Sequence, residues 1–125
     1  MSTGNGAAAH KQRLGAYGEA VAARHLVEVG MVLLDRNWRC SAGEIDLVLR
    51  DGQTLVICEV KTRSSTAYGS PLESVGPEKA SRLRRLAALW IEAHGVRVRD
   101  VRIDLVGVLR PEGAAAVIDH VQGVG

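Results

Sequence analysis

The sequence predicts an α/β fold in which helices flank a central mixed five-stranded sheet, in the order helix, three strands, helix, two strands. Apolar residues recur at helical spacing in two stretches and alternate or cluster, as they do in strands, in five others. Asp51-Gly52 between two apolar runs is a strong hairpin signal. The second helix separates the third and fourth strands, which favours a parallel crossover and therefore a mixed sheet.

The 125 residues fit one domain and leave no room for two, and 46% hydrophobic content is enough for a core. Residues 1–12 are rich in glycine and small side chains, so we expect a flexible N-terminal tail there. Residues 13–122 are expected to form the single folded domain.

The first half of the chain predicts one helix and three strands. The helix is expected from about Leu14 to Val29, because its apolar residues share one face and Gly30 follows as a stop. Met31–Cys40 is expected to be extended. Glu44–Arg50 and Thr54–Arg63 are the two strands of the predicted hairpin.

The second half predicts a loop, a helix and two strands. Ser64–Pro77 is polar and contains glycine and proline, as loops do. A helix is expected from Pro77 or Glu78 to His94, before Gly95. Val101–Leu109 alternates as a strand does, and a short last strand is expected near Val117–Val121.

Composition excludes several classes of protein. Neither a signal peptide nor an apolar stretch of about 20 residues is visible, so we expect a cytoplasmic protein with no membrane partner. Walker A, dinucleotide-binding and Gly-x-Ser-x-Gly motifs are absent, and cysteines and histidines lack zinc-site spacing. The net charge of +2 does not by itself indicate a nucleic-acid binder.

Two carboxylates and a lysine are the strongest candidates for chemistry. In the hairpin, Asp46 and Glu44 share one face of the first strand, opposite Ile45, while Glu59 and Lys61 share one face of the second. The tight turn can bring Asp46 beside Glu59, although the sequence does not fix the register.

Two neighbouring carboxylates repel each other unless a cation lies between them. Magnesium prefers oxygen ligands and needs only one or two carboxylates beside substrate phosphate. A nearby lysine can then contact the attacking water or a phosphate oxygen, which suits phosphodiester hydrolysis. Two alternatives stay open, because Glu-Val-Lys on a strand is commonly a solvated face, and the acids can instead form a salt-bridge network with Lys61 and Arg63.

The chain resembles the YraN-type family of small bacterial proteins from Leu14 to about Val108. The motifs that carry this resemblance are Leu14-Gly15-Ala16-Tyr17-Gly18-Glu19, Arg36-Asn37-Trp38-Arg39-Cys40, Gly43-Glu44-Ile45-Asp46-Leu47, Glu59-Val60-Lys61-Thr62-Arg63, Tyr68-Gly69-Ser70-Pro71 and Lys79. That family is similar to Holliday-junction resolvases and belongs to the restriction-endonuclease-like (PD-(D/E)XK) fold group. The resemblance implies a nuclease-like domain with Asp46 as the motif aspartate, Glu59 as the second acid and Lys61 as the motif lysine. Glu44-Ile45 replaces the motif proline.

Further residues complete the candidate site. Glu19 borders the apolar face of the first helix, and the resemblance implies that it reaches the metal through water or a second ion. The carbonyl of Val60 would assist Asp46 and Glu59 as a metal ligand. Several basic residues are candidates for contacts with nucleic-acid phosphates, namely Arg36, Arg39, Arg63, Lys79 and Arg82. Lys79 can equally extend along the apolar surface, and the arginines around Arg82 can form a solvated helix face.

Three other residues are assigned no chemistry. His25 is expected to pack on the helix face. Asp104 is expected to have a structural role, although its immediate neighbours in the sequence are the same as those of Asp46. For Glu44, the sequence does not separate a role beside the site from an acid that faces solvent. The sequence therefore predicts a magnesium-dependent endonuclease that also accepts manganese. We expect it to act on branched or flapped DNA in repair or recombination, and a homodimer is possible. The alternative is a non-catalytic nucleic-acid-binding or accessory module on the same fold.

Overall fold

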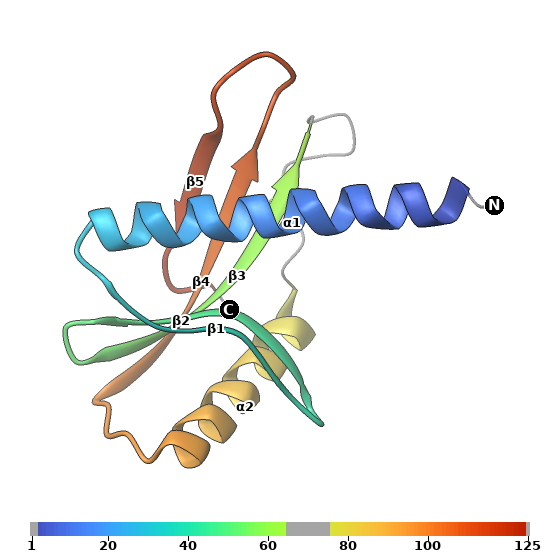
Figure 1. Ribbon diagram of the computed structural model, residues 1–125. Coiled ribbons are helices and arrows are strands. Elements are labelled where there is room, and N and C mark those ends of the chain that lie inside the picture. Colours follow the sequence, from blue (N-terminus) through green and yellow to red (C-terminus); the bar gives the residue numbers. More distant parts are fainter. Residues whose placement is uncertain (1–2, 65–75, 125) are drawn as a thin grey trace.

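The computed structural model describes residues 3–64 and 76–124, and the side chains of residues 3–8 and 11 are not among the described parts (Figure 1). The predicted loop Ser64–Pro77 lies almost wholly outside these ranges. Tyr68-Gly69-Ser70-Pro71, one of the motifs that carry the family resemblance, also lies outside the described residues.

The order of elements is the predicted one. The chain forms α1 (Thr3–Glu28), β1 (Val32–Cys40), β2 (Gly43–Asp51), β3 (Thr54–Arg63), α2 (Pro77–His94), β4 (Asp100–Leu109) and β5 (Val117–Val121). The strands lie in the order β1-β2-β3-β4-β5, with β3 and β4 parallel and the other pairs antiparallel. The predicted mixed five-stranded sheet, the hairpin at Asp51-Gly52 and the parallel crossover are therefore confirmed.

The helix α1 begins at Thr3, so the prediction that residues 1–12 form a tail separate from the first helix is wrong for the described part of that segment. Ala7, Ala8 and Ala9, followed by Lys11, Gln12 and Arg13, are strong helix formers, and they extend the helix beyond its first apolar residue. Among the described residues, neither helix combines the length and the apolar character needed to cross a bilayer.

The two helices cover opposite faces of the sheet, and each closes its own core (Figure 1). On the central strand β3, Val56 and Cys58 pack in the core beneath α1, whereas Leu55 and Ile57 pack in the core beneath α2. All four side chains are fully buried, so this part of β3 is covered on both faces. Glu59 follows directly after this run, where β3 leaves the core.

The regular alternation of β2 is interrupted at Asp46. Leu47 and Leu49 pack in the core beneath α1, but Ile45 packs in the core beneath α2. Ile45 and Leu47 therefore lie on opposite faces of the sheet, which strict alternation along the strand would not give. The pairing of β2 with β3 runs only from Asp51 to Leu47, so beyond Leu47 the strand β2 is paired with β1 alone and one constraint on strict alternation is lost.

Asp104 is a fully buried carboxylate that holds β4 and β5 together. Arg102 donates two hydrogen bonds to it, Nε to Oδ1 at 2.8 Å and Nη2 to Oδ2 at 3.0 Å. His120 Nε2 lies 2.8 Å from Oδ2, and the Gly123 N–H donates to Oδ1 at 3.1 Å. Every oxygen of this carboxylate is satisfied, which agrees with the structural role expected from the sequence.

Gly18 lets α1 approach β3 closely. A Cβ atom at this position would lie 2.9 Å from Thr62 Cβ and would also overlap Thr62 Oγ1. Threonine is branched at Cβ and has few rotamers with which to avoid such a contact. Gly15, one turn earlier, has no atom within 4 Å of the equivalent position. The spacing of α1 over the sheet is therefore set at Gly18.

We expect Gly18→Ala to lower the free energy of unfolding by about 1–3 kcal/mol, because the added methyl pushes α1 away from Thr62. Gly15→Ala is the matched control, and its better helix propensity should stabilise the protein by about 0.5–1 kcal/mol. Urea unfolding of both variants measures the difference. Equal stabilisation by both substitutions would show that α1 does not rest on β3 at Gly18.

Asp104→Asn should lower the free energy of unfolding by about 3 kcal/mol, because it removes the buried charge that accepts two hydrogen bonds from Arg102 and leaves the guanidinium only Asp51 at 3.1 Å. Asp119→Asn, an exposed position on the neighbouring strand, serves as the control and should change stability by about 0.5 kcal/mol at most. Thermal and urea unfolding would report both effects. A variant at residue 104 as stable as the control would refute the structural role.

Candidate functional site

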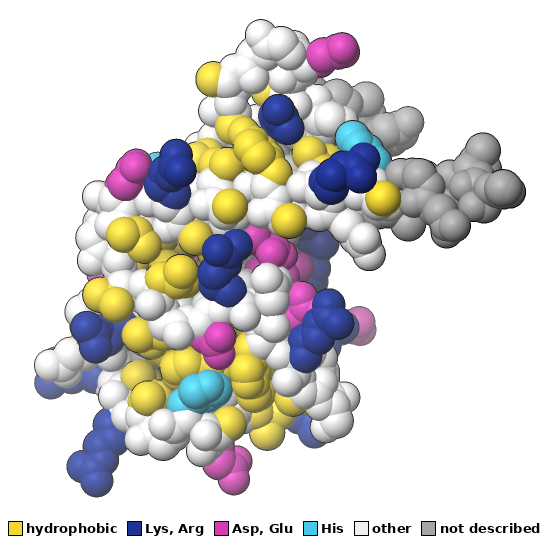
Figure 2. Space-filling view, viewed as in Figure 1, with side chains coloured by type: hydrophobic (Ala, Val, Ile, Leu, Met, Phe, Trp, Pro, Cys, Tyr) yellow, Lys and Arg dark blue, Asp and Glu magenta, His cyan; other side chains and the backbone are white. Residues whose placement is uncertain are grey.

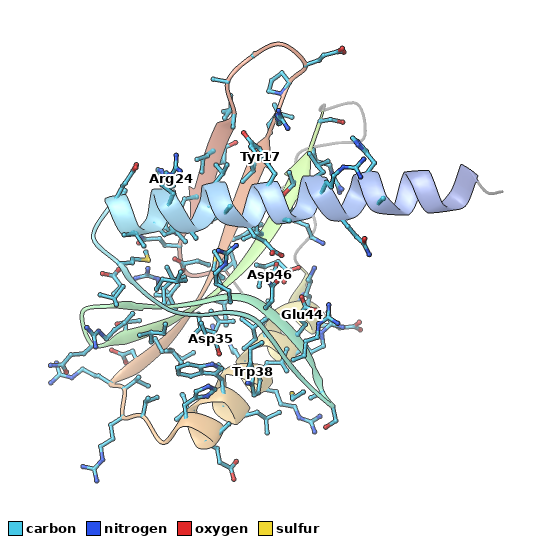
Figure 3. The ribbon with its side chains drawn as sticks, viewed as in Figure 1. Tyr17, Arg24, Asp35, Trp38, Glu44 and Asp46 are labelled. Atoms are coloured by element: carbon cyan, nitrogen blue, oxygen red, sulfur yellow. The ribbon has the colours of Figure 1, made fainter. Side chains whose placement is uncertain are left out.

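The predicted catalytic residues meet where β2 and β3 stop pairing. The last pair of the ladder is Leu47 with Cys58, so one further step would place Asp46 opposite Glu59. Figure 3 shows Asp46 just below α1, with Glu44 on the same strand. The adjacency inferred from the hairpin signal is thus present in the backbone.

The carboxylate of Asp46 takes the place that a backbone carbonyl would have as hydrogen-bond acceptor for the neighbouring strand. Its Oδ2 accepts a hydrogen bond of 2.8 Å from the Val60 N–H, one residue beyond Glu59. A carboxylate that takes an amide of the neighbouring strand is held in one orientation and needs no further side chain to fix it. The same contact fixes the backbone of Val60, whose carbonyl is a predicted metal ligand.

Several acids share this region, and their charges act on one another. Burial is the main reason that the pKa of Asp46 rises from its ordinary value to about 7, and the hydrogen bond from Val60 opposes that rise. Three further carboxylates raise the pKa more, those of Glu59, Glu19 and Glu44. Full ionisation of this cluster is therefore costly without a compensating cation.

Two lysines flank Glu59, and both approach the same oxygen. Lys79 Nζ from α2 lies 2.7 Å from Glu59 Oε1, and Lys61 Nζ from β3 lies 3.6 Å from it. Burial lowers the pKa of Lys61, and the neighbouring Lys79 lowers it further. Lys79 was predicted as a contact for phosphate, and the structure brings it directly into the candidate site.

Glu19 faces the site from α1. Burial raises its pKa, while a side-chain hydrogen bond with Asn37 lowers it, and nearby charges on Glu44 and Arg36 act in opposite directions. Asn37 was not predicted as a site residue. It has φ of 52° within β1, a left-handed conformation that asparagine tolerates better than most residues. An asparagine within a predicted strand is the sequence signal that could have drawn attention to Asn37.

The predicted phosphate contacts have different surroundings. Arg39 is largely exposed and forms an ion pair of 2.7 Å with Glu44, and Arg82 is exposed on α2. Arg63 is half-buried and, with Lys61 and Glu19, lines a hollow of about 500 Å³ between α1 and the end of β3. Figure 2 shows acidic and basic side chains alternating over this face of the molecule.

The acids fit a magnesium ion that keeps most of its water. Among the described residues, no three histidine, cysteine or acidic side chains are placed to hold one ion together. Magnesium, however, is commonly bound through one or two carboxylates, with waters and substrate phosphates filling the other positions. Asp46 and Glu59 provide the two carboxylates of that lower requirement, and Glu19 is close enough to act on the charge of Asp46.

Comparison with known proteins identifies close relatives. Residues 18–108 match the model of the uncharacterised protein family UPF0102. A UPF0102 protein of Nocardioides sp. is 66% identical over 123 residues, which cover 98% of this chain and 99% of the relative. A UPF0102 protein of Streptomyces griseus subsp. griseus is 58% identical, and the match covers 89% of this chain and 94% of the relative. A UPF0102 protein of Acidothermus cellulolyticus is 46% identical, and the match covers 94% of this chain and 97% of the relative.

The raised pKa of Asp46 makes its ionisation oppose folding. The unfolded side chain ionises near pH 3.8 and the folded one near pH 7, so the free energy of unfolding should fall between these values and then level off. Asp46→Asn cannot ionise and keeps an oxygen for the Val60 N–H. We expect this variant to exceed the wild type in stability by on the order of 2–4 kcal/mol above pH 7.

Urea unfolding across a pH series measures this difference, with Asp119→Asn as the matched exposed control. Below about pH 3, where the wild-type carboxyl is protonated in both states, the advantage of Asp46→Asn should disappear. A constant difference at every pH would mean that the substitution changes packing and that Asp46 ionisation carries no cost.

Proposed function

The chain belongs to the uncharacterised protein family UPF0102, and we propose that it is a metal-dependent endonuclease with a restriction-endonuclease-like core that hydrolyses phosphodiester bonds in DNA. The observation that carries this proposal is the meeting of Asp46, Glu59 and Lys61 at the point where β2 and β3 stop pairing. Two acids and a lysine on neighbouring strands are the set of groups that metal-assisted phosphodiester hydrolysis needs.

Asp46, Glu59 and the Val60 carbonyl would hold a magnesium ion, for which manganese could substitute, and Glu19 would contact its water. The raised pKa of Asp46 supports this assignment, because a divalent ion relieves the repulsion among the acids that contributes to the shift. When bound, the ion supplies polarisation of the phosphate and a more acidic water.

Lys61 is the group best suited to orient the attacking water or a phosphate oxygen. It is half-buried, lies 3.6 Å from Glu59 and has a lowered pKa, so it gives up a proton more readily than an exposed lysine. Lys79 holds Glu59 from the opposite side at 2.7 Å. That ion pair orients the carboxylate, and its ammonium group is available to a phosphate that enters the site.

The proposed substrate is DNA with a branch or a flap, in repair or recombination. The basic candidates around the site, such as Arg63 and Lys79, offer charge to phosphates, which positions a nucleic acid without reading its sequence. Recognition of shape therefore suits this site better than recognition of a base sequence. Enzymes that cut two strands commonly act as dimers, and a homodimer remains part of this proposal.

The contacts of Glu59 favour one alternative function. Its Oε1 is already paired with Lys79 and approached by Lys61, so its charge is balanced without a metal. A site closed in this way would suit a non-catalytic module that binds nucleic acid for a repair or processing complex.

Cleavage of a labelled four-way or flapped DNA in magnesium, with loss in EDTA, tests the enzyme. We expect Asp46→Asn, Glu59→Gln and Lys61→Ala each to lower the cleavage rate by about 100-fold or more while the fold is kept, because each removes a group needed in the transition state. Manganese should support cleavage by the wild type.

Glu92→Gln, on the exposed face of α2 away from these acids, is the control and should cleave as the wild type does. If wild-type protein leaves a panel of DNA and RNA substrates intact with both metals, the enzyme proposal fails. Tight binding to those same substrates, unchanged by Asp46→Asn, would then favour the accessory module.

A further inference from the structure

A second hollow adjoins the candidate site at the end of β3. It has a volume of about 770 Å³ and lies between α1 and the segment that joins β4 to β5. It shares three lining residues, His10, Leu14 and Ser64, with the hollow of about 500 Å³ that contains Lys61. We call the two hollows together, from Lys61 past Ser64 to Arg110, the trench.

Two arginines line the trench, one in each hollow. Arg63 is the last residue of β3 and pairs with Leu109 at the end of β4. The next backbone amide, that of Arg110, donates a hydrogen bond of 2.9 Å to the carbonyl of Arg63. The backbones of the two residues are therefore neighbours at the end of the sheet, and each residue lines one of the two hollows.

The guanidinium group of Arg110 is held in place by α1. Its Cζ lies 4.5 Å from the centroid of the Tyr17 ring, which is a cation–π contact. A stacked guanidinium keeps its N–H groups in the plane and free for an anion. The tyrosine ring is covered by this contact, so it positions a cation and does not serve as a platform for a base.

Arg63 has an unfilled hydrogen-bonding position. Its Nε is the one buried side-chain nitrogen or oxygen among the described residues that lacks a partner. A buried donor without an acceptor is costly in a folded protein and indicates a ligand or a solvent molecule. A phosphate oxygen is the acceptor that arginine binds most strongly, through two parallel hydrogen bonds.

We propose that the trench binds one extended strand of nucleic acid, with successive phosphates on Arg63 and Arg110, and leads that strand to the site at Lys61. Each hollow has the size of a small-ligand pocket, which accommodates parts of one strand, whereas the rounded surface of a duplex would rest on its rims. Basic grooves that follow the backbone are typical of single-strand binding. Cleavage of the bound strand depends on the proposed endonuclease function, whereas binding of the strand in the trench does not.

Fluorescence anisotropy with a labelled 12-nucleotide oligothymidylate, in EDTA, tests binding without any cleavage. We expect R63Q and R110Q each to weaken binding about tenfold, because each removes a charged hydrogen-bond donor to a phosphate. The slope of log affinity against log salt should fall by about 0.7 for each lost phosphate contact. A labelled hairpin duplex of equal strand length should bind more weakly than the single strand.

R99Q removes the same charge from the exposed segment before β4, at the opposite end of the sheet from the trench, and should bind within about twofold of the wild type. If R99Q loses as much affinity as R110Q, or if the duplex binds more tightly than the single strand, the proposal is wrong. Arg110 is exposed, so R110Q carries the test alone should R63Q lower the melting temperature.

The two proposals fail in different ways. Single-strand binding that depends on Arg63 and Arg110, without cleavage in magnesium or manganese, would refute the enzyme and support the trench. Cleavage that is lost in Asp46→Asn but unchanged in R63Q and R110Q, with unchanged binding, would support the enzyme and refute the trench.

Discussion

The hydrogen bond from the Val60 N–H to the carboxylate of Asp46 is the contact on which the site depends. A backbone amide at the end of a strand needs an acceptor, and here a side chain takes the place of the neighbouring strand. The β2–β3 ladder therefore ends at Leu47, and Ile45 is free to pack on the other face of the sheet. This one hydrogen bond thus lies where the β2–β3 pairing ends and holds the carboxylate of Asp46 between the two strands.

Both helices contribute residues to the site because both contact the end of β3. On one face, the absence of a side chain at Gly18 lets α1 lie against Thr62, and Glu19 follows directly. On the other face, α2 begins at Pro77 and presents Lys79 to Glu59 within its first turn. The charges of the site therefore come from three layers of the fold, and a shift of either helix would change their balance.

The sequence predicts the elements well because their signals are local. Helical periodicity, the Asp51-Gly52 turn and the buried run before Glu59 depend on neighbouring residues alone. The early start of α1 was not predicted, although its helix-forming residues stand in the sequence. The change of face at Asp46 and the left-handed Asn37 were not predicted because both depend on contacts with distant parts of the chain. The meeting of Asp46 and Glu59 was accessible from the hairpin, whereas the pairing of Glu59 with Lys79 requires the packing of α2.

Asp46 and Asp104 share the same local sequence, but the fold surrounds them with different partners. Both stand in an Ile-Asp-Leu-Val stretch on a neighbour of β3. Asp104 receives two hydrogen bonds from Arg102 and further contacts from His120 and Gly123, so its charge is fully compensated. Asp46 receives one amide hydrogen bond, and burial together with nearby acids raises its pKa, so its charge is less well compensated than that of Asp104. The two acids therefore have similar neighbours in the sequence but different partners in the fold, because those partners come from segments that are distant along the chain.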